Sequence, residues 1–544
     1  MTVCRTRVSS LGWLCVLACG VVASAADWPQ WGGTDDRNMI SREKGLPDSF
    51  VPGDKDPQGT GIKMETTQNV KWVARLGGTA YGNPTVANGR VFVGTDDQTV
   101  DADPRFKRTK GGMVKCFEEA TGKLLWQLVV PARTGLPKEF HYGQQQLGTC
   151  SSPTVDGDHV YVVTNADEVV CLDVHGQVGG NRGPFTDEAK YMVQPGQPAL
   201  EVKPTDGDIL WRYDIIEELK VIPHDVASCH ILVHGDFLYV GTSNGVDHGH
   251  ERALAPDAPA IIVLNKKTGK LAAMENEGIS KRMFHAQWSP PSLGKVGDKT
   301  LVFFGGTDGW CYAFETLTAM PEKPVFLKKV WSYDCNPPEY RLHPDGNPMH
   351  YMSGDKRRKD GPNKESLNKN DGTYVGPSEV IATPVFYKNR IYVAIGHDPM
   401  HGRGKGLLHC IDATKTGDIT KTGCLWKYDG LDRTISNATI ADGLLYIPDI
   451  AGRVHCLDAE TGKVYWVYET GAETWGSVLA ADGKLYFGTQ KAFFIMAAGK
   501  EAKVLNRITL GSPAYSTPIV ANGVLYVASQ RYLWAVQQMP AKKP

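Results

Sequence analysis

The sequence predicts an all-β fold: an eight-bladed β-propeller of four-stranded antiparallel blades, closed by an N-terminal strand. The main evidence is a sequence motif that recurs along the chain. In each copy, the start of one strand lies eight positions before an aromatic residue of the next strand. Pro84 is followed in this way by Phe92, and Ala438 by Tyr446. The two least interrupted copies, from Ala438 and from Val478, begin 40 residues apart, a period that indicates a propeller or another repeat array. The other evidence is a solitary strand before the first copy.

Each copy contains the parts of one blade, as the sixth copy shows. Residues 434–441 are predicted to form the innermost strand, and Asp442-Gly443 the hairpin turn before the second strand. A third strand covers residues 454–458, and a Thr-Gly-Lys loop leads to the outer strand, which starts at Val464. A sheet of alternating strands cannot bury both faces alone, so the blades stack around an axis and the ring closes.

The solitary strand supplies the prediction of ring closure. The last copy ends at a third strand, residues 532–536, whereas residues 69–76 stand alone before the first copy. We therefore expect the N-terminal strand to complete the last blade of a propeller that spans residues 68–544. The extension at residues 27–67 has no such role in the repeat, and we expect removal of its residues 27–51 to have a mild effect.

Tryptophan positions predict how neighbouring blades pack. The element Thr-Gly-Lys-x-x-Trp recurs at residues 121–126 and 461–466, and Trp72 holds the same position on the solitary strand. Such a tryptophan can lie flat against the next blade and bury about 150–250 Å². The third copy has Ala273 at this position.

Five cysteines also share one register and are predicted to be buried thiols, because equivalent sites in separate blades are too far apart for a disulfide: Cys116, Cys171, Cys311, Cys410 and Cys456.

Charge and the N-terminus indicate where the protein works. The formal net charge is −1, from 59 basic and 60 acidic residues; because there is no basic stripe, we expect no nucleic-acid partner. Residues 1–26 have the pattern of a signal peptide, whose apolar run is too short to span a bilayer. The mature protein is therefore expected to be periplasmic or secreted, without a transmembrane segment. A lipid anchor at Cys19, with outer-membrane association, is the alternative.

The repeat resembles the pyrroloquinoline-quinone-like (PQQ-like) repeat, most clearly at Gly111 to Trp126 and at Cys456 to Trp466. Eight such blades form the fold of quinoprotein alcohol dehydrogenases. Similar blades build non-catalytic proteins, including the periplasmic lipoprotein subunit of the outer-membrane barrel assembly machinery. The resemblance therefore implies the fold strongly and a cofactor only weakly, since one fold hosts many functions.

The dehydrogenase resemblance implies PQQ on the propeller axis and a calcium ion held by a glutamate and an asparagine, next to a vicinal cysteine pair. This chain has no adjacent cysteines. Its nearest match to the calcium segment is Gly245 to Gly249, where Asp247 replaces the glutamate and Asn244 precedes it. Asp247 and Asn244 are the metal ligands expected if the protein is a PQQ- and calcium-dependent dehydrogenase of an alcohol or sugar. The interpretation we favour is a turn that connects two strands.

Two histidine-containing loops raise a second metal hypothesis. His248 and His250, with the neighbouring carboxylates, could share a divalent ion, and so could His397 and Asp398 with His401. Loop histidines are more often solvated or hydrogen-bonded locally, and that is what we expect here.

The ligand site is predicted at one mouth of the central channel. The innermost strands start there, and this chain places Gln287, Trp288, His230 and Trp475 where small residues would suffice. The tryptophans can stack on a planar ligand or a sugar, or equally fill the channel. Long loops are expected to add to this face, from insertions near residues 97–112, 176–205, 246–259, 335–378 and 397–405.

We expect a non-catalytic binding or scaffold protein, with a protein or saccharide partner at the funnel and loops and no firm cofactor. The dehydrogenase is the alternative. A polysaccharide-binding or lyase-like propeller is a third class, supported only by the tryptophans.

Overall fold

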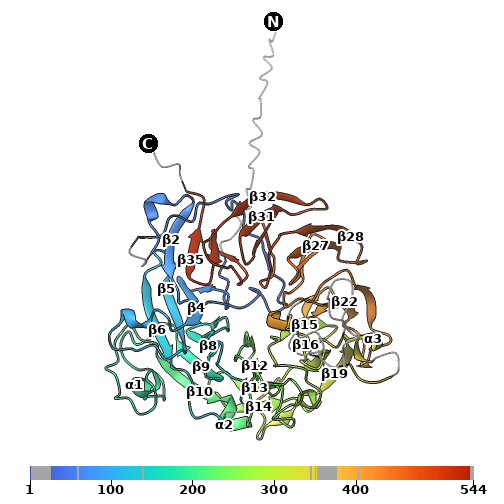
Figure 1. Ribbon diagram of the computed structural model, residues 1–544, viewed down its shortest axis with the longest axis horizontal. Coiled ribbons are helices and arrows are strands. Elements are labelled where there is room, and N and C mark those ends of the chain that lie inside the picture. The colour runs from blue at the N-terminus through green and yellow to red at the C-terminus, as the bar shows by residue number, and fades with distance from the viewer. Residues whose placement is uncertain are drawn as a thin grey trace.

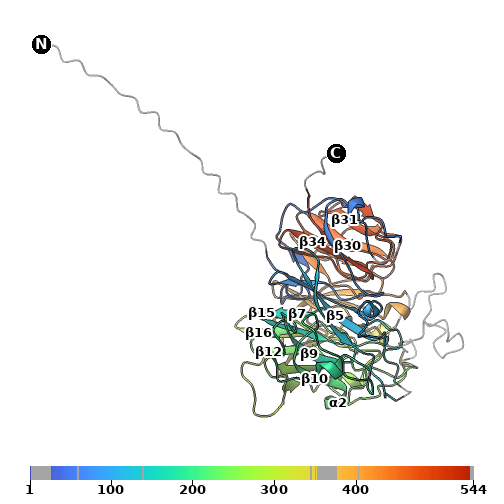
Figure 2. The same ribbon diagram turned by 90° about the vertical axis from the view of Figure 1, so that its left-hand side faces the viewer.

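The computed structural model describes residue 1 and residues 26–57, 61–137, 140–342, 346–349, 351, 376–401 and 403–539. The signal peptide with Cys19, and most of the insertion near residues 335–378, lie outside the described residues. Eight antiparallel sheets follow one another around a ring in chain order (Figure 1), which confirms the eight-bladed propeller. Figure 2 shows the ring from the side, with β30, β31 and β34 at one edge and β10 and α2 at the other.

Within each blade the strands run outward from the axis in sequence order, except that the last blade takes its outer strand from the N-terminal region. The blades comprise, in order, β3 (Thr85–Ala87), β4 (Arg90–Asp96), β5 (Gly112–Glu118) and β6 (Leu124–Val130); β7 (Thr154–Asp156), β8 (His159–Val163), β9 (Glu168–Asp173) and β10 (Ile209–Asp214); β11 (Leu232–His234), β12 (Phe237–Gly241), β13 (Ile261–Asn265) and β14 (Leu271–Met274); β15 (Ser292–Val296), β16 (Lys299–Gly305), β17 (Trp310–Glu315) and β19 (Lys329–Asp334); β20 (Val385–Tyr387), β21 (Arg390–Ile395), β22 (Leu407–Asp412) and β24 (Cys424–Tyr428); β25 (Thr439–Ala441), β26 (Leu444–Pro448), β27 (Arg453–Asp458) and β28 (Val464–Glu469); β29 (Leu479–Ala481), β30 (Lys484–Gly488), β31 (Phe493–Ala497) and β32 (Lys503–Ile508); β33 (Ile519–Ala521), β34 (Val524–Ala528), β35 (Tyr532–Val536) and β2 (Val70–Arg75). Short additional elements are β1 (Ile40–Ser41), β18 (Val325–Phe326), β23 (Gly417–Asp418), α1 (Glu188–Tyr191), α2 (Ile215–Leu219) and α3 (Pro338–Arg341).

The solitary N-terminal strand closes the ring as predicted. β2 pairs antiparallel with β35, from Val70 opposite Val536 to Arg75 opposite Tyr532. The indole nitrogen of Trp72, on the same strand, donates to the carbonyl of Glu119 in the first blade, at 2.9 Å. One strand thus completes the eighth blade and joins it to the first.

The predicted tryptophan packing is also confirmed. The indoles of Trp72, Trp126, Trp211 and Trp426 lie against a turn glycine of the following blade. A Cβ atom added to Gly462 would lie 2.6 Å from the Trp426 ring, and one added to Gly122 would lie 2.6 Å from the Trp72 ring. The glycines are thus needed both for their positive φ and for the space that the indole occupies.

Substitution of Trp466 is expected to destabilise the ring strongly. Its side chain is buried and its indole nitrogen donates to the carbonyl of Gly499 in the next blade, at 2.9 Å. Trp466→Ala should lower the free energy of unfolding by about 3–5 kcal/mol, as large aromatic truncations in cores do, measured by denaturant melting. The matched control, Val467→Ala on the exposed face of the same strand, should change it by less than about 0.5 kcal/mol. A loss below about 1 kcal/mol for Trp466→Ala would contradict this packing argument.

The contacts of the N-terminal extension argue against the expectation that removal of residues 27–51 has a mild effect. Residues 26–39 pass across the hairpin end of the ring and are hydrogen-bonded to the innermost strand, or to its flank, in every blade. β1 then adds to β29 as a parallel neighbour. The repeat pattern does not predict the contacts of this segment, because the segment belongs to no repeat. The bonded residues, from the first blade to the eighth, are Val86, Val155, Ile231, Leu293, Phe386, Ile440, Ala480 and Asn522.

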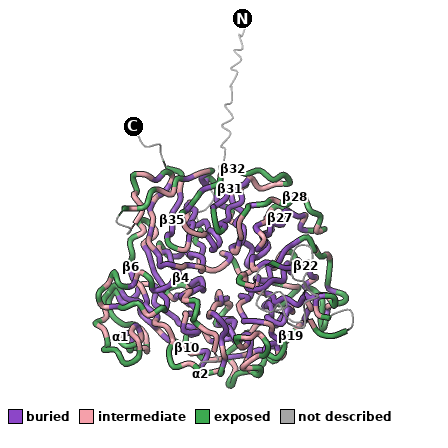
Figure 3. The backbone as a smooth tube through the Cα atoms, viewed as in Figure 1, coloured by how far each residue is buried: buried purple, intermediate pink, exposed green. Residues whose placement is uncertain are grey.

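Burial follows the ring geometry. The inner strands are buried and the exposed segments lie at the rim (Figure 3). The cysteines of the described residues are free thiols, all buried except Cys424, which confirms the prediction for the shared register. No helix among the described residues is long and apolar enough to cross a membrane.

Candidate functional site

A cavity of about 1240 Å³ occupies the propeller axis. Because neighbouring strands are antiparallel, the loops between second and third strands and the connectors between blades emerge at the same end of the ring. These loops and connectors form most of the cavity wall. The extension crosses the opposite end, where Trp31 contributes to the wall. The cavity therefore opens toward the loops.

Three aromatic rings form one wall. Trp475 stacks on Tyr515 with ring centroids 4.1 Å apart and an interplanar angle of 16°, and Tyr81 is stacked 5.7 Å from Trp475. All three residues line the cavity. Nearly parallel rings held in this way form a rigid apolar surface on which a flat ligand can lie.

The predicted funnel residues are brought together in part. Trp288, Trp475 and His230 line the cavity. Gln287 is fully buried instead, with its amide donating to Gly305 O and accepting from the Thr307 N–H. Its side chain is thus used to hold the backbone of the next strand.

His230 is packed as an uncharged ring. It stacks on Trp31 with centroids 4.1 Å apart, and its Nδ1 accepts from the Ser152 N–H at 2.9 Å. Burial, with a smaller contribution from the Arg37 charge, lowers the pKa of His230 to about 3. The ring is therefore neutral at physiological pH and adds to the apolar part of the wall.

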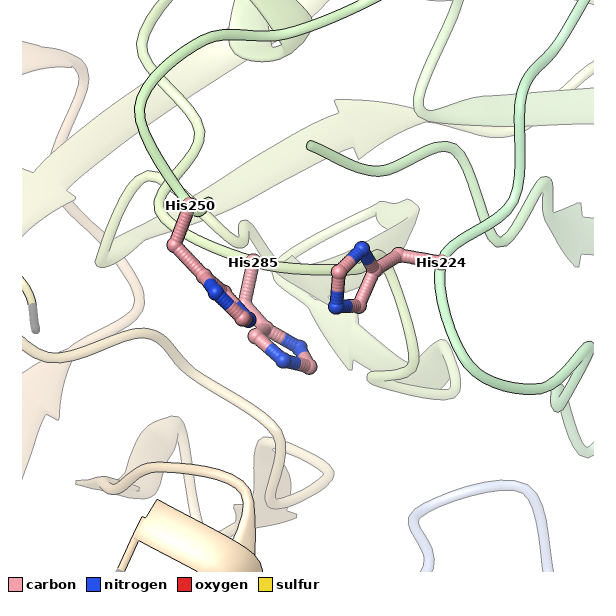
Figure 4. Close-up of side chains that lie close together, drawn as sticks. All are labelled: His224, His250 and His285. Atoms are coloured by element: carbon pink, nitrogen blue, oxygen red, sulfur yellow. The ribbon is translucent and has the colours of Figure 1, made fainter. Parts of the chain in front are cut away.

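A cluster of histidines lies on the opposite side, where His224 and His250 line the cavity and His285 is fully buried next to them. His224, His250 and His285 point toward one another (Figure 4) and offer nitrogen atoms that all lie within 4.8 Å of each other. The ring centroids are 4.6 Å apart for His224 with His250 and for His224 with His285, and 4.9 Å for the third pair. A group of this size and composition could hold a metal ion.

Two carboxylates and a further histidine adjoin this cluster. Asp225 has one oxygen 3.0 Å from His141 Nε2, and its other oxygen lies 3.8 Å from His224 Nε2 and 3.7 Å from His285 Nε2. An oxygen of Asp398 is 4.0 Å from His285 Nε2. Carboxyl groups thus border the nitrogens of His224 and His285.

Burial makes the imidazoles neutral. Burial, followed by the neighbouring histidines, lowers the pKa of His285 well below its ordinary value. Burial and His224 lower the pKa of His250 to about 2. Neutral imidazole, with a free nitrogen lone pair, is the form that binds metals. Burial, with the nearby carboxylate of Asp225, raises the pKa of Asp398 to about 7.

The chain assembles this wall from separate blades. His224 and Asp225 lie between α2 and β11, His250 between β12 and β13, and His285 between β14 and β15. Asp398 lies between β21 and β22. All of these segments emerge at the open end of the ring.

Sequence reasoning found part of the cluster and missed the rest. His250 and Asp398 were expected in two separate loops, and the structure brings those loops together. His250 is partly exposed, but its Nε2 is inaccessible to solvent and has no hydrogen-bond partner among the described residues. His224 and His285 were missed. Each lies a few residues before the start of an innermost strand, so a census of titratable residues in the inter-blade connectors would have found them.

The pair expected to hold calcium makes other contacts. The amide oxygen of Asn244 accepts from the Ile222 N–H at 3.1 Å, and its amide nitrogen donates to Ala255 O and to Ser280 Oγ. Asp247 accepts from the Glu251 N–H at 2.9 Å. Asn244 thus joins its own loop to the segments that contain Ile222 and Ser280, whereas the hydrogen bond of Asp247 stays within one loop.

Comparison with known proteins agrees with the fold. A family model described as outer membrane protein assembly factor BamB matches residues 110–275 and 404–500. No curated protein matches the sequence. Among solved structures, a europium-containing methanol dehydrogenase has 12% sequence identity and a TM-score of 0.52, over 93% of this chain and 89% of that chain.

Two further solved structures are similar at lower scores. BamB from Moraxella catarrhalis has 13% identity and a TM-score of 0.48, over 87% of this chain and 98% of that chain. A quinohemoprotein alcohol dehydrogenase from Comamonas testosteroni has 12% identity and a TM-score of 0.44, over 96% and 82%. At these identities the likeness concerns the fold alone.

Proposed function

We propose that this eight-bladed propeller of PQQ-like repeats is a binding protein whose axial cavity takes up a saccharide. The observation that carries the proposal is the wall of stacked rings, Tyr81, Trp475 and Tyr515, inside a cavity of about 1240 Å³. The flat apolar face of a sugar ring can lie on such a wall, while its hydroxyl groups meet the polar wall opposite. The protein is proposed to act outside the cytoplasm, where the pattern of residues 1–26 would direct it.

A binding role is supported by the part of the chain that matches the BamB family model, whose description is that of an assembly factor. Such factors work by contact with other molecules, so a protein partner on the loops at the open face is compatible with a saccharide in the cavity. Outer-membrane association would follow if Cys19 carries a lipid.

The dehydrogenase alternative needs calcium beside a quinone. Calcium prefers oxygen ligands, and the amide oxygen of Asn244 would have to leave the Ile222 N–H to provide one. The vicinal cysteine pair of the dehydrogenases is also absent from the sequence. These contacts favour binding over quinone-dependent oxidation.

Binding is tested by titration of the purified mature protein with cello- and chito-oligosaccharides, followed by calorimetry. Trp475→Ala should weaken the binding of the best ligand by about tenfold, because a stacked aromatic contact contributes about 0.5–1.5 kcal/mol. The melting temperature should change little. Phe326→Ala, on the exposed outer strand β18, is the control and should bind as the unaltered protein does.

Two results would overturn the proposal. One is the absence of binding across the panel. The other is oxidation of an alcohol or glucose that requires added PQQ and calcium and is abolished by Asp247→Ala, which would establish the dehydrogenase instead.

A further inference from the structure

We propose that the axial cavity contains a transition-metal centre, in which His224, His250 and His285 bind one divalent ion of the zinc or copper type. This inference goes beyond saccharide binding and does not depend on it. It rests on the placement of unpartnered nitrogen atoms, on the group that orients one of the rings, and on the donor chemistry of the site.

The imidazole nitrogen atoms of the cluster are buried without hydrogen-bond partners. His224 and His285 are fully buried. Neither nitrogen of His285 has a hydrogen-bond partner, and the same holds for Nε2 of His224 and of His250. Buried polar atoms in folded proteins are nearly always satisfied, and each exception costs free energy. One nitrogen of each ring lies within 4.8 Å of the other two, and an ion bound among them would satisfy these three atoms together.

His224 is oriented by a hydrogen bond from its second ring nitrogen. Its Nδ1 donates to the carbonyl of Val246 at 2.8 Å, which leaves Nε2 without a proton and directed at the other two rings. Metal-binding histidines usually donate their second nitrogen to a carbonyl or carboxylate in this way. The hydrogen bond therefore fixes both the tautomer and the direction that coordination requires.

Two residues at the cluster have a left-handed backbone conformation. Asp225 and His250 have φ values of 59° and 56°, in the left-handed region that side chains other than glycine adopt uncommonly. Such conformations cost free energy and gather at functional sites. Here they hold the Asp225 carboxylate and the His250 ring at the same cluster.

The donor set selects the kind of ion. Imidazole nitrogens suit zinc, copper, nickel and iron, whereas calcium and magnesium prefer oxygen. Three protein ligands with a further open position are typical of zinc sites that accept water or substrate, while structural zinc sites have four. His224 and His250 line the cavity, so the centre adjoins the space from which an added ligand would approach. Asp225, with an oxygen 3.8 Å from His224 Nε2, supplies negative charge beside it.

The test is metal uptake by the full mature protein after dialysis against a chelator. Titration with Co²⁺, followed by visible absorption and by metal analysis after gel filtration, should give one tightly bound ion per chain and the intense visible bands of four-coordinate Co²⁺. Zn²⁺ should displace Co²⁺. His224→Gln and His285→Gln should each weaken binding by more than about 100-fold, since changes to groups around the ligands alone cost 10–100-fold.

A matched control is His409→Gln. This histidine is also buried, but its nitrogens are bonded to the Tyr333 hydroxyl and to the Cys335 carbonyl. It should leave metal uptake unchanged. If a cluster variant fails to fold, the stoichiometry and spectrum of the unaltered protein still decide the matter.

The position of the bound ion can be tested independently by tryptophan fluorescence. The Trp288 ring lies 5.0 Å from the His285 ring, so Cu²⁺ bound at the cluster should quench Trp288 fluorescence, and Trp288→Phe should remove that part of the quenching. The proposal is overturned if the protein retains no Co²⁺ or Zn²⁺. It is equally overturned if uptake persists in the His224→Gln/His285→Gln double variant, which would place the ion elsewhere.

Discussion

Deletion of residues 69–76 should turn a monomeric, cooperatively unfolding ring into a species that aggregates. The deletion removes β2, leaving β35 with an unpaired edge along its length. Exposed edge strands pair with other chains. It also removes Trp72, whose indole is in contact with the first blade. Size-exclusion chromatography and thermal unfolding measure both effects.

A control for this deletion is complementation. A synthetic peptide with the sequence of residues 68–77 should restore the monomer and part of the cooperativity when it is added during refolding. A deletion protein that remains monomeric, with an unchanged melting temperature, would contradict the closure of the ring by β2.

Arg37→Ala should cause the largest loss of stability from a single substitution in the N-terminal extension. The guanidinium is fully buried where the extension crosses the axis, and it donates to Pro291 O at 3.0 Å and to Ile231 O at 3.2 Å. It also donates to the side chain of Gln30 at 3.1 Å. Each buried acceptor left without a partner costs about 1–3 kcal/mol, so unfolding should become easier by about 3 kcal/mol or more, measured in denaturant.

The exposed Arg42 of the same extension provides the comparison for Arg37. Arg42→Ala removes the same charge at a site open to solvent and should change stability by less than about 0.5 kcal/mol. Equal effects of the two substitutions would show that the extension does not hold the hairpin end of the ring together.

Repeated features were predictable from the sequence because each copy confirms the others. The aromatic residue of the second strand, the turn glycine and the outer-strand tryptophan have the same physical role in several blades. Even the exception was visible, since Ala273 stands where the third blade lacks its tryptophan. The partner of β2 was predictable because the last copy lacked one strand.

Features outside the repeat were not predictable in the same way. The crossing of residues 26–39 depends on hydrogen bonds from an irregular segment to all blades, and no period encodes it. The histidine cluster draws on connectors and loops that are distant in sequence, such as those with His224, His250 and His285. Each loop alone has the composition of an ordinary surface segment. Only the ring, by bringing those loops to one axis, makes a site of them.

The most direct test of the axial site is X-ray diffraction from crystals grown with Zn²⁺, with data collected on both sides of the zinc absorption edge. We predict one strong anomalous peak inside the axial cavity, within bonding distance of the His224, His250 and His285 nitrogens. Zinc–nitrogen distances there should be about 2.0–2.1 Å. Peaks confined to exposed histidines, or an axial cavity without any peak, would contradict the account.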